Sequence, residues 1–209
     1  MKRFVLSALS AVVAASALTA CAPLVIGGAA VGVMVSIDRR TPGTQVDDET
    51  IELKAGARMR ELFGERAHVN ITSFNRQVLL TGEVPTEQAK QQAEQALGRI
   101  ENVKGVVNEL GVMGVSTIGQ RSSDTLVTGK VKASLVDAQD LYVGAFKVVT
   151  ERGTVYLMGR VTQRESDRAT QITRTISGVQ RVVRIFELIS EDELRQLVPS
   201  QARPAAAKQ

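Results

Sequence analysis

The sequence predicts an α+β protein of two tandem domains, because one pattern of helices and strands occurs twice along the chain. Residues 78–84 (VLLTGEV) align with residues 155–161 (VYLMGRV). The pattern VxxVV at residues 103–107 recurs at residues 179–183. Only two copies occur, whereas a solenoid needs at least about three shorter repeats to bury a continuous core. We therefore expect two copies of one small fold.

Each copy begins with a segment whose apolar residues recur at helical spacing. Asp48 and Asp124 precede these segments, and we expect both to act as helix N-caps. The expected inward stripes are Ile51, Ala55, Met59 and Leu62 in the first copy and Val127, Val131, Leu135 and Ala138 in the second. A second, more polar helix is expected at residues 86–100 and again at residues 162–176.

Two alternating apolar segments follow the first helix of each copy and predict a β-hairpin. The turns fall at residues 75–76 and 152–153, and the flanking strands, such as residues 78–80, alternate as strands that are buried on one face. A last strand, at residues 103–110 or 179–188, closes each sheet. Each domain is thus expected to hold a three-stranded sheet and two helices, in the order αββαβ.

The N-terminus carries a short apolar segment that ends at the only cysteine, Cys21. Two basic residues precede an uncharged run at residues 5–17, which is the pattern of a secretory signal and is too short to span a bilayer. The sequence Leu18-Thr19-Ala20-Cys21 resembles the bacterial lipobox, which implies a diacylglycerol on the Cys21 thiol, cleavage before Cys21 and an N-acyl chain on the new amino group. A plain signal peptide with an incidental cysteine is the alternative. Because Ala22 rather than aspartate follows the cysteine, the resemblance favours the periplasmic face of the outer membrane.

These observations divide the chain into six segments. They are a signal peptide at residues 1–20, a lipidated tether at 21–46, domain 1 at 47–110, a linker at 111–123, domain 2 at 124–188 and a flexible C-terminal tail at 189–209. Domain 1 carries eight Lys and Arg against eleven Asp and Glu, while residues 122–188 carry ten against seven. The second domain is therefore the one suited to anionic lipid head groups, where each nearby Lys or Arg contributes about 1 kcal/mol.

The order of elements, the hydrophobic-Gly-x-Val strand ends and the lipobox together resemble tandem BON-domain proteins. The lead-in TxGTQVDD at residues 41–48 is similar to that of dual BON-domain outer-membrane lipoproteins, a family associated with cell division and outer-membrane stress. The resemblance covers nearly all of residues 47–188. It implies an αββαβ sandwich in each domain, no catalytic activity, and binding to phospholipid or to envelope partners in support of envelope integrity.

The first helix of the second copy carries the candidate lipid-binding surface. Leu126 stands where the first copy has Thr50, about 100° around the helix from the apolar stripe. Lys130 follows one turn later, and an apolar strip beside a cation is typical of an interfacial helix. The resemblance implies phospholipid binding on this helix, at a position where the family has an aromatic residue and this chain has Leu126. The predicted phospholipid-binding residues are Leu126, Val127, Lys130, Ala133 and Ser134.

Two alternatives stay open at this point. In the first, Leu126 packs between the two domains or under the linker instead of facing lipid. In the second, the protein is an interaction adaptor, whose acidic first copy and exposed strand edges recruit an outer-membrane assembly factor or a cell-wall hydrolase regulator. Binding of the protein to anionic vesicles separates the lipid-binding module from the adaptor.

Other kinds of site have little support in the sequence. His68 is the only histidine, and no Gly-x-Ser-x-Gly elbow supplies a nucleophile. The acidic cluster at residues 47–49 offers too few oxygen ligands for calcium, and seven aromatic residues without a Trp argue against nucleic-acid stacking. We expect no enzyme, no metal, no cofactor besides the acyl chains on Cys21, no nucleic-acid partner and no small-molecule substrate.

Overall fold

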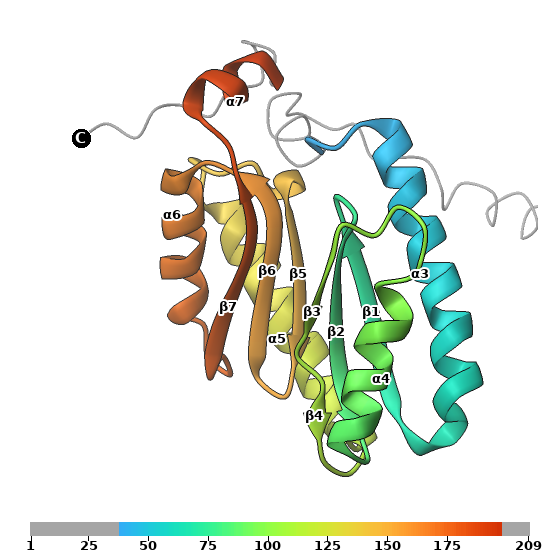
Figure 1. Cartoon of the computed structure of the whole chain (residues 1–209). Coiled ribbons are helices and arrows are strands. Elements are labelled where there is room, and N and C mark those ends of the chain that lie inside the picture. Colours follow the sequence, from blue (N-terminus) through green and yellow to red (C-terminus); the bar gives the residue numbers. More distant parts are fainter. Residues whose placement is uncertain (1–37, 198–209) are drawn as a thin grey trace, which may run out of the picture. The chain divides into compact units, whose positions relative to one another are not determined.

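A computed structural model describes residues 38–197 of the chain (Figure 1). All described residues belong to one compact unit. The predicted signal peptide, Cys21 and most of the tether lie outside the described residues, as does the end of the predicted tail.

The first copy folds around one mixed sheet. Helix α3 (Pro42–Phe63) and the 3₁₀ turn η2 (Gly64–Arg66) lead into a hairpin of β1 (His68–Phe74) and β2 (Gln77–Val84). Helix α4 (Glu87–Leu97) then crosses over to β3 (Gly105–Asn108), which pairs with β2 in parallel, as a crossover connection requires. A short strand, β4 (Gly111–Val112), also pairs with β2 in parallel beyond the end of β3.

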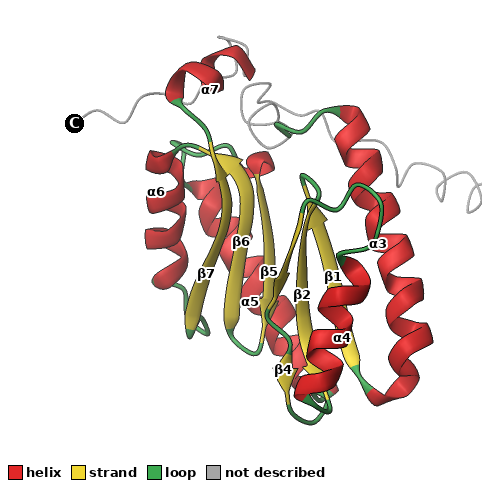
Figure 2. Cartoon of the chain, viewed as in Figure 1, coloured by secondary structure: helices red, strands yellow, loops and turns green. Residues whose placement is uncertain are grey.

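The second copy repeats this order. Helix α5 (Ile118–Asp137) and the 3₁₀ turn η3 (Val143–Ala145) precede the hairpin of β5 (Phe146–Glu151) and β6 (Thr154–Val161). Helix α6 (Gln163–Arg174) crosses over to β7 (Arg181–Leu188), which pairs with β6 in parallel, and a short helix α7 (Glu191–Leu197) follows. The predicted α+β class and the αββαβ order of both domains are confirmed, as Figure 2 shows.

Each domain has its own core between its helices and one face of its sheet. In the first domain the stripe of α3 packs against alternate residues of β2, and in the second the stripe of α5 packs against alternate residues of β6. The buried members of the two stripes are Ile51, Ala55, Met59 and Phe63 on α3 and Val127, Val131 and Leu135 on α5. Apart from Phe63, these are residues that the helical spacing predicted.

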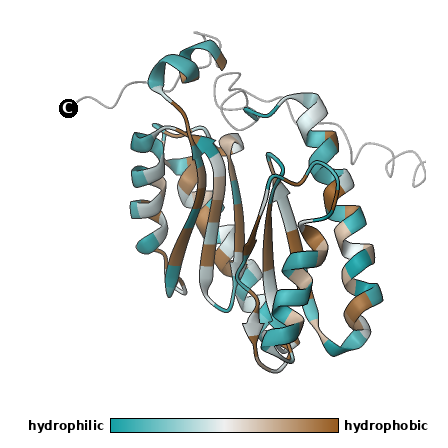
Figure 3. Ribbon diagram, viewed as in Figure 1, coloured by the Kyte–Doolittle hydropathy of each residue, from teal (hydrophilic) through white to brown (hydrophobic). Residues whose placement is uncertain are grey.

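The opposite faces of the two sheets pack against each other. Phe74 and Leu79 of the first sheet form one buried cluster with Tyr156 and Met158 of the second. Strands β2 and β6 are therefore buried on both faces, and Figure 3 shows hydrophobic residues along the strands of both sheets. The prediction that these strands are buried on one face only is wrong, because the second face is covered by the other domain. Continuous apolar runs, such as residues 155–158, are typical of strands covered on both sides.

The two aspartates that were expected as helix caps lie inside the helices. Thr41 caps α3 and Thr117 caps α5, each with a side chain that accepts a hydrogen bond from the backbone three residues on. Asp48 is instead buried, and its carboxylate accepts from the backbone N–H groups of Asn75 and Arg76 in the β1–β2 turn at 2.8 and 2.7 Å. The prediction that Asp48 and Asp124 act as N-caps is therefore wrong.

Asp124 makes the same contact in the second copy. Its carboxylate accepts from the N–H groups of Arg152 and Gly153 in the β5–β6 turn, at 2.8 and 2.9 Å. Arg152 has a positive φ of 48°, as Asn75 and Arg76 do in the first turn. Each aspartate thus pins a strained hairpin turn to the first helix of its own domain.

Secondary structure extends into segments that were expected to be linkers. Helix α3 begins at Pro42, within the predicted tether, and α5 begins at Ile118, within the predicted linker. In the predicted flexible tail, Ile189 and Leu194 are buried in the core of the second domain, so helix α7 packs on that domain. The remaining boundaries of the predicted segments stay predictions.

Candidate functional site

Helix α5 is fixed at its start, along its inner face and against the neighbouring hairpin. Thr117 and Gln120 form a reciprocal capping box, in which each side chain accepts a hydrogen bond from the other residue's backbone N–H. Val127, Val131 and Leu135 bury the inner face in the core. The outer face of a helix held in this way is presented in one orientation, which a recognition surface needs.

The outer face of α5 exposes several apolar residues. Ile118 and Leu126 are 83% and 68% exposed, and Val136 is also exposed. At 100° per residue, Gly129 and Ala133 fall within about 60° of Leu126, so small residues surround the leucine. Helix α5 carries two carboxylates: Asp124 is buried, and Asp137, the last residue of the helix, is exposed about 20° around the helix from Leu126. We call the exposed residues of this side, Ile118, Leu126, Gly129, Lys130, Lys132, Ala133 and Val136, the α5 surface.

Two lysines flank the apolar part of this surface. Lys130 and Lys132 are exposed, and Lys130 lies about 40° around the helix from Leu126. Neither lysine has an ion-pair or hydrogen-bond partner among residues 38–197. An exposed apolar strip beside free cations is the arrangement of helices that lie at a membrane interface.

Four of the five predicted lipid-binding residues reach the surface. Leu126, Lys130 and Ala133 are exposed and Ser134 is half-buried. Val127 is 5% exposed and lies in the core, so the prediction that it contacts lipid is wrong. It follows Leu126 by about 100° around the helix, which already puts it on the inner face. The alternative that Leu126 packs between the domains is also wrong, because its side chain is exposed.

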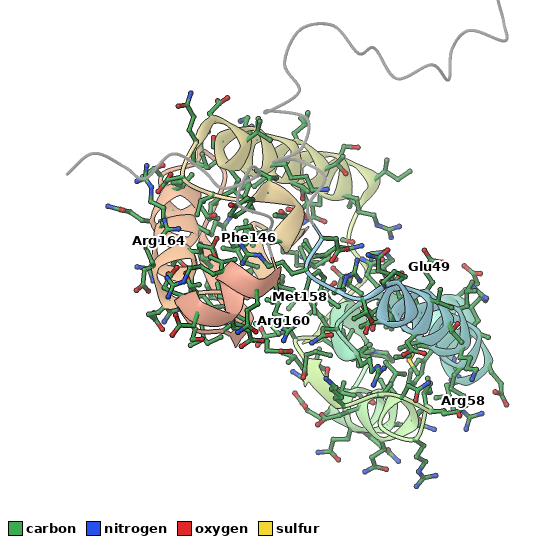
Figure 4. The ribbon with its side chains drawn as sticks, turned by 90° about the horizontal axis from the view of Figure 1, so that it is seen from above. Glu49, Arg58, Phe146, Met158, Arg160 and Arg164 are labelled. Atoms are coloured by element: carbon green, nitrogen blue, oxygen red, sulfur yellow. The ribbon has the colours of Figure 1, made fainter. Side chains whose placement is uncertain are left out.

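The matching helix of the first domain has a different outer face. Val46 and Leu53 are exposed on α3, but the carboxylate of Glu49 is exposed between them, and Thr50 stands in the place of Leu126. Figure 4 labels Glu49 on this helix. A carboxylate is repelled by an anionic head group. On α3 it lies between the exposed apolar residues, whereas on α5 the exposed carboxylate, Asp137, is the last residue of the helix.

A second group of polar side chains gathers where β1 and β2 of the first domain meet β5 of the second. His68, Glu83 and Glu151 each offer one potential ligand atom, and these atoms lie within 4.8 Å of one another. No local pattern indicates this cluster, because its members come from three strands. Arg152 Nε donates to Glu83 Oε1 at 2.6 Å and His68 Nδ1 lies 3.1 Å from Glu83 Oε2, so Glu83 already has close partners.

The two carboxylates of this cluster respond in opposite directions to their surroundings. Burial opposes the charge of Glu83, but hydrogen bonds from the Ser116 N–H, Arg152 and His68 outweigh it and hold the pKa of that carboxyl below its usual value. Burial raises the pKa of Glu151, with a smaller contribution from the nearby charge of Glu83. The cluster is therefore best described as an ionic contact between the domains, with Glu83 ionised.

Within residues 38–197, no helix combines the length and apolar character that crossing a bilayer requires.

The described residues thus form a two-domain α+β protein whose αββαβ domains pack sheet to sheet. The BON domain model matches residues 47–114 and 123–188. The outer membrane lipoprotein DolP of Haemophilus influenzae is 37% identical over 174 residues, which are 82% of this chain and 90% of that protein. A 21 kDa hemolysin of Actinobacillus pleuropneumoniae is 30% identical, covering 73% of this chain and 80% of that protein. The osmotically-inducible protein Y of Escherichia coli is 27% identical, covering 67% and 72%.

The chain thus belongs to the BON family and carries two BON domains. It is a membrane-associated lipoprotein of the outer membrane. The predicted family and localisation are confirmed.

Proposed function

We propose that the protein is anchored by acyl chains on Cys21, binds anionic phospholipid through the α5 surface of its second BON domain, and supports envelope integrity without catalysing a reaction. The observation that carries the proposal is the exposed Leu126 beside the free Lys130 and Lys132, on a helix whose one exposed carboxylate, Asp137, is its last residue. The same face of α3 in the first domain carries Glu49, so the proposal concerns the second domain alone.

The energies favour a contact that is weak by itself. Complete burial of a leucine side chain contributes about 1.5–3 kcal/mol, and each lysine near an anionic surface contributes about 1 kcal/mol. Such a sum gives reversible binding of the isolated domain, because ordering the helix on the surface has its own entropic cost. Leucine keeps the apolar side chain of an interfacial anchor but lacks the preference of aromatic rings for the head-group region.

The acyl anchor complements this weak contact. Each buried methylene contributes about 0.8 kcal/mol, and two or three chains on one residue make release very slow. A tethered domain then meets the lipid surface at an effective concentration in the millimolar range, so a weak contact becomes substantially occupied. In this proposal Cys21 supplies retention and α5 supplies orientation and lipid selectivity.

A vesicle-binding assay tests the α5 contact. Residues 22–209, which lack the acyl anchor, are mixed with vesicles that contain phosphatidylglycerol or only phosphatidylcholine. We expect binding to the anionic vesicles that weakens as salt is added, because exposed charges are screened. The double variant Leu126→Glu/Lys130→Glu should abolish it.

A matched control makes the same change of charge on the first domain. Val46 and Arg60 are exposed on α3, and Val46→Glu/Arg60→Glu should bind as the unmodified protein does. Unchanged binding by the α5 variant would overturn the phospholipid proposal. Absence of binding by the unmodified protein at low salt would instead favour the adaptor function.

A further inference from the structure

The first domain has a groove of about 540 Å³ between helices α3 and α4. Lys54, Arg58 and Leu62 line it from α3 at intervals of four residues, which puts them on one side of that helix. From the other side it is lined by α4 and the turn that follows, including Ala96, Arg99 and Ile100. The groove thus combines an apolar floor with three cations.

The cations of the groove are available to an outside anion. Among the described residues no Asp or Glu lines the groove. Lys54 lies 3.5 Å from Glu101 and Arg58 lies 2.6 Å from Glu61, but both pairs are largely exposed, and exposed pairs contribute little to stability. Arg99 has no ion-pair or hydrogen-bond partner within residues 38–197. An anion with several oxygens can therefore replace these contacts at small cost.

The second domain provides an internal comparison. Its equivalent helices carry Ser134 in place of Arg58 and Thr175 in place of Arg99. The apolar floor is kept, because Ile172 and Ile176 stand where Ala96 and Ile100 do. The arginines are thus a property of the first domain, which is otherwise the more acidic of the two.

The chemistry of the groove fits a phosphate that carries an apolar group. Guanidinium groups bind phosphate oxygens in pairs of parallel hydrogen bonds, and two arginines beside a lysine suit a phosphomonoester with two negative charges. The volume lies in the range of ligand pockets, and Leu62, Ala96 and Ile100 offer a surface for a hydrocarbon chain. A carboxylate peptide would find the same cations but has no comparable use for the apolar floor.

The groove does not share a membrane with the α5 surface. The two sheets pack against each other, so the helices of the two domains cover opposite outer sides. Figure 4 shows α4 and α5 on opposite sides of the described residues. It also labels Arg58, on helix α3. A bilayer on α5 would therefore leave the α3–α4 groove pointing away from it.

We infer that the α3–α4 groove binds a single molecule of a phosphomonoester lipid, with its phosphate on Arg58, Arg99 and Lys54 and its apolar part on the floor between the helices. This site lies apart from the α5 surface and does not depend on the proposed function.

Chemical-shift mapping of the ¹⁵N-labelled protein tests the inference. Residues 22–209 are titrated with dihexanoyl phosphatidic acid below its critical micelle concentration. We expect saturable shifts along the facing sides of α3 and α4. The variant Arg58→Ser/Arg99→Thr carries the residue types that the second domain has at the equivalent positions. It should bind phosphatidic acid at least about tenfold more weakly. Inorganic phosphate and dihexanoyl phosphatidylcholine should each bind more weakly than phosphatidic acid.

The control variant removes two positive charges outside the groove. Arg60 lies about 200° around α3 from Arg58, and Lys104 follows α4 beyond the groove. The variant Arg60→Val/Lys104→Gln, again with the residues of the second domain, should bind as the unmodified protein does. Equal loss in both variants, unchanged binding by Arg58→Ser/Arg99→Thr, or equal affinity for inorganic phosphate overturns the inference. Shifts in the groove should persist in the Leu126→Glu/Lys130→Glu background, which separates this site from the α5 surface.

Discussion

Arg39 lies just before the first BON domain in sequence but is held by the second. Its guanidinium donates to both carboxylate oxygens of Glu165 at 2.8 and 2.7 Å and to the carbonyl oxygen of Arg160 at 2.9 Å. Both side chains of the pair are fully buried, and the guanidinium lies 5.2 Å from the ring centre of Tyr142. Burial opposes the charge of Glu165, but the hydrogen bonds and charge of Arg39 outweigh it and lower the pKa of that carboxyl. The end of the predicted tether is thus fastened to the second domain.

Removal of Arg39 should destabilise the protein strongly. Arg39→Met leaves the carboxylate of Glu165 buried without its partner, which lowers the free energy of unfolding by about 3–5 kcal/mol at pH 7. Urea unfolding measures this loss. The double variant Arg39→Met/Glu165→Met should recover most of it, because replacing both partners leaves no unpaired charge.

The same pair gives a pH dependence of defined sign. In the unmodified protein the folded state lowers the pKa of Glu165, so the ionised carboxylate stabilises the fold. This stabilisation is present above the ordinary carboxyl pKa and is lost as pH falls through the pKa that Glu165 has in the folded protein. In Arg39→Met, burial without a partner raises the pKa of Glu165, so protonation relieves the cost. The difference in the free energy of unfolding between Arg39→Met and the unmodified protein should therefore shrink as pH falls from 7 towards 4. A difference that stays constant over this range would show that the charge of Glu165 does not cause the loss of stability.

At the scale of elements, two glycines explain the strand-end motif of the repeats. Gly82 in β2 has a φ of 104°, and a Cβ there would lie 2.0 Å from the carbonyl oxygen of His68 in β1. Gly159 holds the corresponding place in β6, where a Cβ would lie 2.6 Å from the carbonyl oxygen of Ala145. At these points the backbone at the start of the preceding hairpin strand passes so close that no side chain fits.

Two glycine substitutions should have opposite effects on stability. Gly82→Ala should lower the free energy of unfolding by at least about 2–3 kcal/mol, because both the positive φ and the backbone contact oppose a side chain. A Cβ at Gly129, in the middle of α5, would have no atom within 4 Å. Gly129→Ala should therefore raise the free energy of unfolding by about 0.5–1 kcal/mol. Denaturant unfolding of both variants checks the pair. A loss in Gly129→Ala equal to that in Gly82→Ala would contradict the steric explanation.

The local pattern of the sequence predicted elements well and their distant contacts poorly. Within residues 38–197, apolar spacing predicts the four long helices and both hairpins, and the comparison of Leu126 with Thr50 predicts an exposed residue of α5. The helix starts were missed because the first turns of α3 and α5 are polar and carry no apolar period. Local spacing cannot show that Asp48 is no cap, because its partners, in the turn after β1, lie far along the chain. The α3–α4 groove was missed for the same reason, since its cations belong to two separate helices.

At the scale of the whole described region, the interface between the domains combines an apolar centre with charged pairs around it. Phe74, Leu79, Tyr156 and Met158 form the centre. Arg152 of the second domain reaches Glu83 of the first at 2.6 Å, and Arg181 of β7 reaches Glu109 at 2.6 Å. Burial, together with the charge of Glu109, raises the pKa of Tyr156 to about 12, so this side chain is neutral in the interface. Apolar burial of this kind makes the stability of each domain depend on the other.

This interface predicts that the two BON domains unfold in one transition. Scanning calorimetry of residues 22–209 should show a single peak whose van't Hoff and calorimetric enthalpies agree. Met158→Asp should remove that coupling. Met158 is 1% exposed and faces the other sheet, whereas its neighbour Leu157 faces the core of its own domain. A carboxylate at residue 158 would therefore be buried without a partner when the sheets meet, at about 3–5 kcal/mol, while leaving the core of the second domain intact.

The variant should unfold in two separate transitions, because each domain keeps its own core after the sheets part. Met113→Asp is the matched control, since Met113 is 48% exposed and the same substitution there should keep the single transition. Two transitions already present in the unmodified protein would mean that the charged pairs and the apolar centre do not couple the domains. A single, unshifted transition in Met158→Asp would mean that the interface accepts a charge, which a dry contact between two sheets cannot do.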